Sequence, residues 1–135
     1  MKTLAIKAGV LAALVLFAVT GGAVAHAGMV EGTVQGFACL INDKVCPVDR
    51  LDPHVGIEKS FVIVDKSGAY YFVPNMDRSI LARNILRKVR ATGKVSSKYK
   101  AIMAESFHVF NKGQWQEVWS LEMERKEAAA YQMGT

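Results

Sequence analysis

Cys39 and Cys46 are the only two cysteines in this 135-residue sequence, and six residues separate them. Such a pair can form a disulfide, bind a metal through thiolates or exchange electrons. Redox catalysis of the thioredoxin type uses two intervening residues, which is not the spacing here. His54 is the nearest histidine that could join both thiolates on zinc or copper, but no CxxC or HxxxH spacing accompanies it. The choice among a disulfide, a metal site and a redox pair therefore depends on the compartment in which the protein works.

Residues 1–27 have the order of a cleavable secretory signal peptide. Lys2 and Lys7 precede the uncharged apolar run 8–19, and Ala25-His26-Ala27 follows as a small-x-small cleavage site. Twelve apolar residues rise about 18 Å as a helix, which is short against a hydrocarbon core of about 30 Å. We expect cleavage after Ala27, with Gly28 as the first mature residue. The short form is typical of bacteria and predicts a periplasmic or secreted protein.

Two alternatives to this cleavage stay open. Cleavage after Ala25 fits the same pattern, and small residues up to Ala27 could lengthen the apolar run into a retained anchor. No cysteine lies beside the cleavage site, which argues against a lipid anchor. We expect contact with a membrane only if the signal is not removed.

Export favours a disulfide between Cys39 and Cys46, because an even number of cysteines in an exported protein is typical of disulfide bonding. Closing this eight-residue loop contributes about 2.5 kcal/mol by loop-closure entropy. The alternative is a periplasmic metal- or redox-handling accessory protein that uses Cys39, Cys46 and His54.

The mature chain is small and basic. Removing 27 of 135 residues leaves 108, the size of one domain. The signal carries two of the 17 basic residues and none of the 12 acidic ones, so the mature net charge is +3. No nucleophile elbow, phosphate loop or dinucleotide fingerprint is present. The sequence therefore predicts no enzyme and no cofactor.

The mature sequence reads as a series of short strands with one helix. Gly32 or Gly36 predicts a bend or bulge in the first strand, Gly93 predicts a strong bend or bulge, and Asn75 or Asp77 is expected to cap the helix. The expected elements are a strand over 29–38, an irregular segment over 39–56, a hairpin over 59–74, a short helix, strands over 88–98, 101–110 and 114–121, and a flexible or helical tail over 123–135.

Five strands with a helix between the third and the fourth follow the order of the OB fold. The segment VRATGKV, residues 89–95, resembles the fourth strand of many OB domains. The resemblance covers about residues 29–111 and is one of pattern, similar to small periplasmic OB-fold proteins. It implies an all-β, five-stranded OB-like barrel within residues 28–122, followed by a C-terminal hairpin strand. An SH3-like or other small barrel is the alternative.

Residues 78–100 contain eight basic side chains and no acidic one. OB barrels commonly bind ligands on strands two and three through aromatic stacking and cations. The resemblance thus implies a ligand-binding site made of Tyr70, Phe72, Arg83, Arg87, Arg90 and Lys94. We expect an anionic ligand or an envelope protein partner. Nucleic acid fits the chemistry but not the compartment, and the alternative is that these cations are solvated and dispersed.

Two further pairs have simple interpretations. Ser106 and His108 share a strand face, but the spacing places no carboxylate to orient the histidine. Trp115 and Trp119 are four apart, so a regular strand puts them on the same face. The sequence as a whole predicts an exported, non-enzymatic OB-fold module that binds a ligand or partner.

Overall fold

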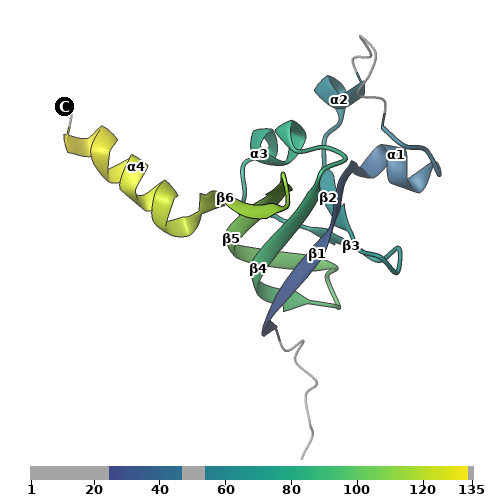
Figure 1. Cartoon of the computed structure of the whole chain (residues 1–135), viewed down its shortest axis with the longest axis horizontal. Coiled ribbons are helices and arrows are strands. Elements are labelled where there is room, and N and C mark those ends of the chain that lie inside the picture. Colours follow the sequence, from purple (N-terminus) through teal and green to yellow (C-terminus); the bar gives the residue numbers. More distant parts are fainter. Residues whose placement is uncertain (1–24, 47–53, 134–135) are drawn as a thin grey trace, which may run out of the picture.

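The computed structural model describes residues 25–46 and 54–133 (Figure 1). Most of the expected signal peptide, residues 1–24, lies outside the described residues, so the signal stays a prediction. Within the expected cleavage site, His26 and Ala27 already belong to strand β1 (His26–Gly36), where they pair with Val95 and Lys94. Cleavage after Ala27 would remove only these two terminal pairs.

Six strands form one sheet in the order β3-β2-β1-β4-β5-β6. Neighbours in that order run antiparallel, while β3 also meets β5 in parallel, where the Phe72 N–H donates to the Lys100 carbonyl oxygen at 2.8 Å. The first five strands thereby close into an OB-like barrel, and β6 adds to the free side of β5. This confirms the predicted fold. The strands after β1 are β2 (Phe61–Val64), β3 (Tyr70–Phe72), β4 (Lys88–Ser96), β5 (Ala101–Asn111) and β6 (Gln114–Ser120).

Alternating apolar side chains of these strands fill the barrel. In β4, Val89, Ala91 and Val95 are buried while the residues between them face outward, apart from Gly93, which has no side chain. Helix α3 (Arg78–Arg83) lies between β3 and β4 in the chain and contributes Leu81 to the core. The largest fully buried side chains are Phe107, Ile63, Ile102, Val34, Val62, Val89 and Val109.

Strand β1 pairs with two other strands, and Gly32 lies where the pairing changes from β4 to β2. Residues 26–33 pair with β4, and residues 33–36 pair with β2. A Cβ at Gly32 would overlap the carbonyl oxygen of Val64. The expected bend at Gly32 therefore corresponds to a backbone approach that only glycine permits.

Gly93 marks the predicted bulge between β4 and β5. The pairing shifts there, because Thr92 pairs with Ser106 and Gly93 with Ala104, which leaves Glu105 as the extra residue. A Cβ at Gly93 would overlap the backbone oxygen of Met103. The absence of a side chain lets β4 and β5 coil tightly at this point.

The β2–β3 hairpin confirms the expected turn. The Asp65 carboxylate accepts hydrogen bonds from the Ser67 N–H, the Ser67 hydroxyl and the Ala69 N–H, and Gly68 adopts a positive φ of 84°. Of the two expected helix caps, Asp77 caps α3 by accepting from the Ser79 N–H at 2.8 Å. Asn75 instead bonds the backbone of β5.

The segment expected to be irregular, residues 39–56, contains helical turns. Helix α1 (Phe37–Ile41) directly follows β1, and α2 (His54–Ile57) precedes β2. Both helices are too short to show a helical period in the sequence, and polar and turn-forming residues dominate this stretch.

Trp115 and Trp119 lie on opposite sides of β6, so the same-face expectation was wrong. Phe107 pairs with Trp119 and His108 with Glu117, which leaves Val118 as an extra residue. A bulge of one residue reverses the alternation beyond it. Trp119 is buried in the core, and Trp115 lies half-buried on the outside against Phe110.

The C-terminal tail is helical, which is one of the two forms expected for it. Helix α4 (Leu121–Met133) extends away from the barrel (Figure 1), and none of its residues is buried. Lys126 and Glu122 form an ion pair one turn apart at 2.7 Å. In the described part of the chain, no helix has the length and apolar character needed to cross a membrane.

Candidate binding face

Three aromatic rings from two separate elements meet on the outside of the barrel. We call Phe37, Tyr70 and Phe72 the aromatic cluster. Phe37 of α1 lies 5.0 Å from Phe72 and 5.5 Å from Tyr70 between ring centroids, and Tyr70 meets Phe72 edge-on at 5.9 Å. All three are half-buried, so part of each ring faces solvent. The Lys100 ammonium lies 4.4 Å from the centre of the Tyr70 ring, within cation–π range.

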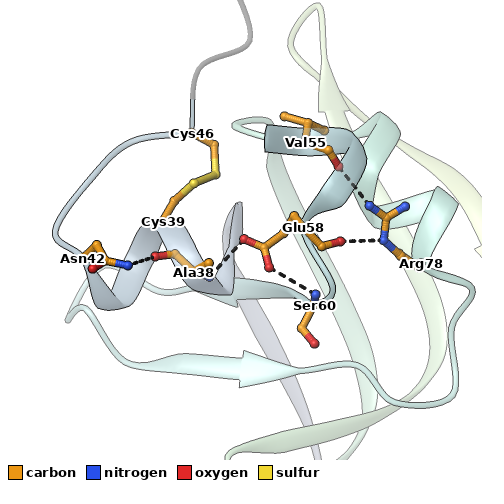
Figure 2. The surroundings of a disulfide bond; sticks show 8 residues. All are labelled: Ala38, Cys39, Asn42, Cys46, Val55, Glu58, Ser60 and Arg78. Carbon is orange, nitrogen blue, oxygen red and sulfur yellow. Dashed lines mark hydrogen bonds between the residues drawn. A yellow bond between two sulfur atoms is a disulfide. The ribbon is translucent and has the colours of Figure 1, made fainter. Parts of the chain in front are cut away.

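The position of Phe37 depends on how α1 is tied to the barrel (Figure 2). The buried carboxylate of Glu58 accepts from the N–H of Ala38, in the first turn of α1, at 3.0 Å and from that of Ser60 at 3.3 Å. Cys39 and Cys46 form the predicted disulfide, with Cα atoms 5.6 Å apart. The Phe37 N–H also donates to the Ser60 carbonyl oxygen at 2.8 Å, and these three ties present Phe37 to the rings on β3.

A hollow adjoins the aromatic cluster at Phe72. Two cations, Lys59 and Arg78, lie along it, and no carboxylate is among the described residues that line it. Its apolar side is formed chiefly by strand β2 and the segment after β3. The lining residues are Lys59, Ser60, Phe61, Phe72, Val73, Pro74, Met76, Arg78 and Leu81.

Arg78 is a cation fixed by backbone carbonyls. Its guanidinium donates to the carbonyl oxygens of Val55, Gly56 and Glu58 at 2.8 to 3.0 Å (Figure 2 draws Val55 and Glu58), and it lies 5.1 Å from the centre of the Phe61 ring. These acceptors are neutral, so they orient the positive charge without cancelling it, while the neighbouring Asp77 carboxylate attracts both Arg83 and Arg78. The hollow therefore has a fixed positive group beside an apolar wall.

Arg90, one of the residues expected at the site, lies elsewhere. Its strand, β4, does not pair with β3, which carries Tyr70 and Phe72. Its guanidinium lies 4.1 Å from the centre of the Trp115 ring and donates to Glu31 at 2.8 Å, while Lys88 reaches the other oxygen of Glu31 at 2.8 Å. This arrangement joins β1, β4 and β6 and balances the charge of Arg90.

The remaining expected cations are dispersed. Arg83 is exposed in the last turn of α3, Arg87 is exposed and donates to the Asn84 side chain at 3.3 Å, and Lys94 is exposed on β4. No ring contact, hydrogen bond or ion pair among the described residues joins them to the aromatic cluster. Of the six expected residues, the structure brings together Tyr70 and Phe72. A binding role for the four cations stays a prediction.

Sequence reasoning did not select Phe37, Lys100 or Arg78 for the site. Lys100 and Arg78 lay within the basic segment, but nothing in the sequence separated them from its other cations. Phe37 was read as the end of a strand. A β3–β5 pairing at Phe72 would have pointed to Lys100, since that pairing places residue 100 next to β3.

The disulfide bears on the metal interpretation of Cys39, Cys46 and His54. Two sulfurs bonded to each other offer no thiolate to a metal. The side chain of His54 lies outside the described residues. Within the described residues, no group of three or more His, Cys, Asp or Glu side chains is arranged to hold a metal ion.

His108 has a carboxylate neighbour that the sequence spacing did not indicate. Glu117 on β6 lies 3.6 Å from His108 Nε2, because β5 and β6 pair at these two residues. His108 Nδ1 is buried and has no hydrogen-bond partner in the described structure. No hydrogen bond joins Ser106 to His108 within the same residues, so a nucleophile–base pair is not assembled.

The contacts of Glu31 predict a pH-dependent contribution to stability. Hydrogen bonds from Lys88 and then Arg90 lower the pKa of Glu31 below its ordinary value. A carboxylate whose pKa is lower in the folded chain stabilises the fold fully above the unfolded pKa, and this contribution is lost as pH falls through the folded pKa. We expect Glu31→Gln to be less stable than wild type at neutral pH, by an amount that shrinks on acidification. Urea unfolding from neutral pH to about pH 2 measures this.

Glu124→Gln is the matched control for Glu31→Gln. Glu124 is exposed on α4, which buries no residue, so its replacement should change the free energy of unfolding little at any pH. A difference between wild type and Glu31→Gln that does not vary with pH would contradict the assignment.

Comparison of the chain with models of protein families, with curated proteins and with solved structures finds no match. The functional interpretation therefore rests on the chain's own geometry.

Proposed function

We propose that the protein is an exported, non-enzymatic binding module that uses the aromatic cluster and the adjoining hollow to bind an anionic ligand. Export is the expectation from residues 1–27. The observation that supports the binding surface is the convergence of Phe37, Tyr70 and Phe72 beside Lys100, next to a hollow with two cations and no described carboxylate. Solvent-facing rings can stack on the ligand while the cations meet its negative group.

The three cations differ in how firmly they are positioned. Arg78 is held by three carbonyl oxygens, and Lys100 rests over Tyr70. Lys59 is exposed at the rim of the hollow. Because preorganised groups lose less conformational entropy on binding, we expect Arg78 and Lys100 to contribute more affinity than Lys59.

Binding of anionic probes tests this proposal. The probes are dextran sulfate, a poly-glutamate peptide and phosphatidylglycerol vesicles, each titrated at low and moderate salt. We expect at least one to bind with an affinity that salt weakens, and we expect Phe72→Ala and Lys100→Ala each to reduce that affinity about five- to tenfold.

Lys112→Ala is the matched control for Lys100→Ala. Both replacements remove one exposed lysine with a positive φ, but Lys112 lies in the turn between β5 and β6, and no described contact joins it to the aromatic cluster. Equal losses for the two variants would assign binding to general positive charge instead of this face. Failure of all three probes to bind would contradict the proposal.

A further inference from the structure

The N-terminal half of β1 has a strand partner on one edge only. Residues 26–33 pair with β4, whereas β2 pairs with residues 33–36 alone. No described strand lies along the second edge of residues 26–32. This edge is separate from the aromatic cluster, since its residues lie beyond the point where β1 leaves β2.

The alternation of β1 identifies the backbone groups that face this free edge. Val34 directs its backbone toward the β4 side, where its N–H donates to Arg87 at 3.3 Å and its oxygen accepts from Leu86 at 2.8 Å. Alternate residues of a strand direct their N–H and C=O groups to opposite edges. Met29 and Glu31 therefore direct theirs away from β4.

A hollow lies beside the free edge. The β2–β3 turn forms its opposite wall, and the half-buried Tyr71 contributes an aromatic ring that also packs on the core. Met29 is 55% exposed beside it. The lining residues are Met29, Val30, Glu31, Asp65, Lys66, Ser67 and Tyr71.

The free edge lacks the features that usually protect sheet edges. Exposed edges are commonly guarded by lysine, proline or an unpaired charge. The part of this edge that belongs to the expected mature chain, GMVEG at residues 28–32, contains no lysine and no proline. Its single acidic side chain, Glu31, is bound by Lys88 and Arg90 on β4. The edge thus presents peptide groups that no described strand pairs, beside a hollow that Met29, Val30 and Tyr71 line together with polar residues of the β2–β3 turn.

We propose that this edge binds an extended peptide segment of a partner protein by β-strand addition. Only an extended polypeptide supplies N–H and C=O groups at the spacing of Met29 and Glu31. Alternate side chains of the added strand would face the hollow, so an apolar residue there would contact Met29 and Tyr71. The bound segment is therefore a β-prone sequence with an apolar residue at the position that faces Met29 and Tyr71.

Selection from a displayed library of random twelve-residue peptides tests the proposal on the mature protein. We expect the recovered peptides to alternate β-branched or aromatic residues with polar ones. Addition of such a peptide should slow hydrogen exchange at the amides of Met29 and Glu31. Met29→Pro removes one outward N–H and should weaken binding about tenfold, whereas Met29→Val keeps that N–H and should bind like wild type.

Three outcomes would overturn the proposal. One is recovery of no peptide, and another is protection of the amides of Tyr70 and Phe72 instead of those of Met29 and Glu31. The third is protection that rises with protein concentration alone, which assigns the edge to a second copy of the chain. Phe72→Ala should leave peptide binding unchanged, which separates this site from the proposed anion-binding face.

Discussion

Replacing Gly32 with alanine is expected to destabilise the barrel by about 3 kcal/mol or more. A Cβ at this position would overlap the Val64 carbonyl oxygen and lie 2.6 Å from its carbon. Both groups are backbone, so no side-chain rotation can relieve the overlap. The strands could separate only by breaking the pairing of Thr33 with Val64, where β1 begins its contact with β2.

Gly56→Ala is the matched control. A Cβ at Gly56 meets no atom within 4 Å, so this variant should unfold within about 0.5 kcal/mol of wild type. Urea unfolding followed by circular dichroism compares the two. Gly93→Ala should resemble Gly32→Ala, because its Cβ would overlap the Met103 backbone oxygen. Equal midpoints for Gly32→Ala and Gly56→Ala would refute the close approach of β1 and β2.

Removing the disulfide is expected to cost about 2.5 kcal/mol of stability and to weaken binding at the aromatic cluster. Cys39 lies in the same five-residue helix as Phe37, both cysteines are buried, and the Cys46 sulfur lies beside Gly36, next to Glu58. Without the bond, the first turn of α1 is held only by the Glu58 carboxylate and by the Phe37 N–H, which donates to the Ser60 carbonyl oxygen at 2.8 Å. Phe37 should then lose its fixed contact with Phe72, and the face loses one of its three rings.

The double variant Cys39→Ala, Cys46→Ala measures both effects. Intact mass of the wild-type mature chain should be two hydrogens below the reduced value and should match a chain that begins at Gly28. Lys44→Ala, within the same loop, is the control and should change neither stability nor binding. A double variant that is weaker in stability but binds dextran sulfate like wild type would show that Phe37 does not need the disulfide.

The sequence by itself determined the order of the strands and of helix α3, together with their turns and caps. The hairpin turn at Asp65–Gly68 and the helix cap at Asp77 each depend on residues close together in the chain. Turn chemistry and capping act over a few residues, so residue types alone indicate them. The strand-helix-strand order that follows from them was enough to predict an OB-like barrel.

Which side chains meet was decided by the tertiary structure alone. The contact of Phe37 in α1 with Phe72 in β3 joins residues 35 positions apart. It depends on Glu58 and on the disulfide, which lie outside β3. Bulges at Glu105 and Val118 reverse the alternation of β5 and β6. The bulge at Val118 places Trp115 and Trp119 on opposite faces of β6, with Trp115 against Arg90 on the outside. A bulge depends on the register between two strands, and the sequence of one strand does not specify that register.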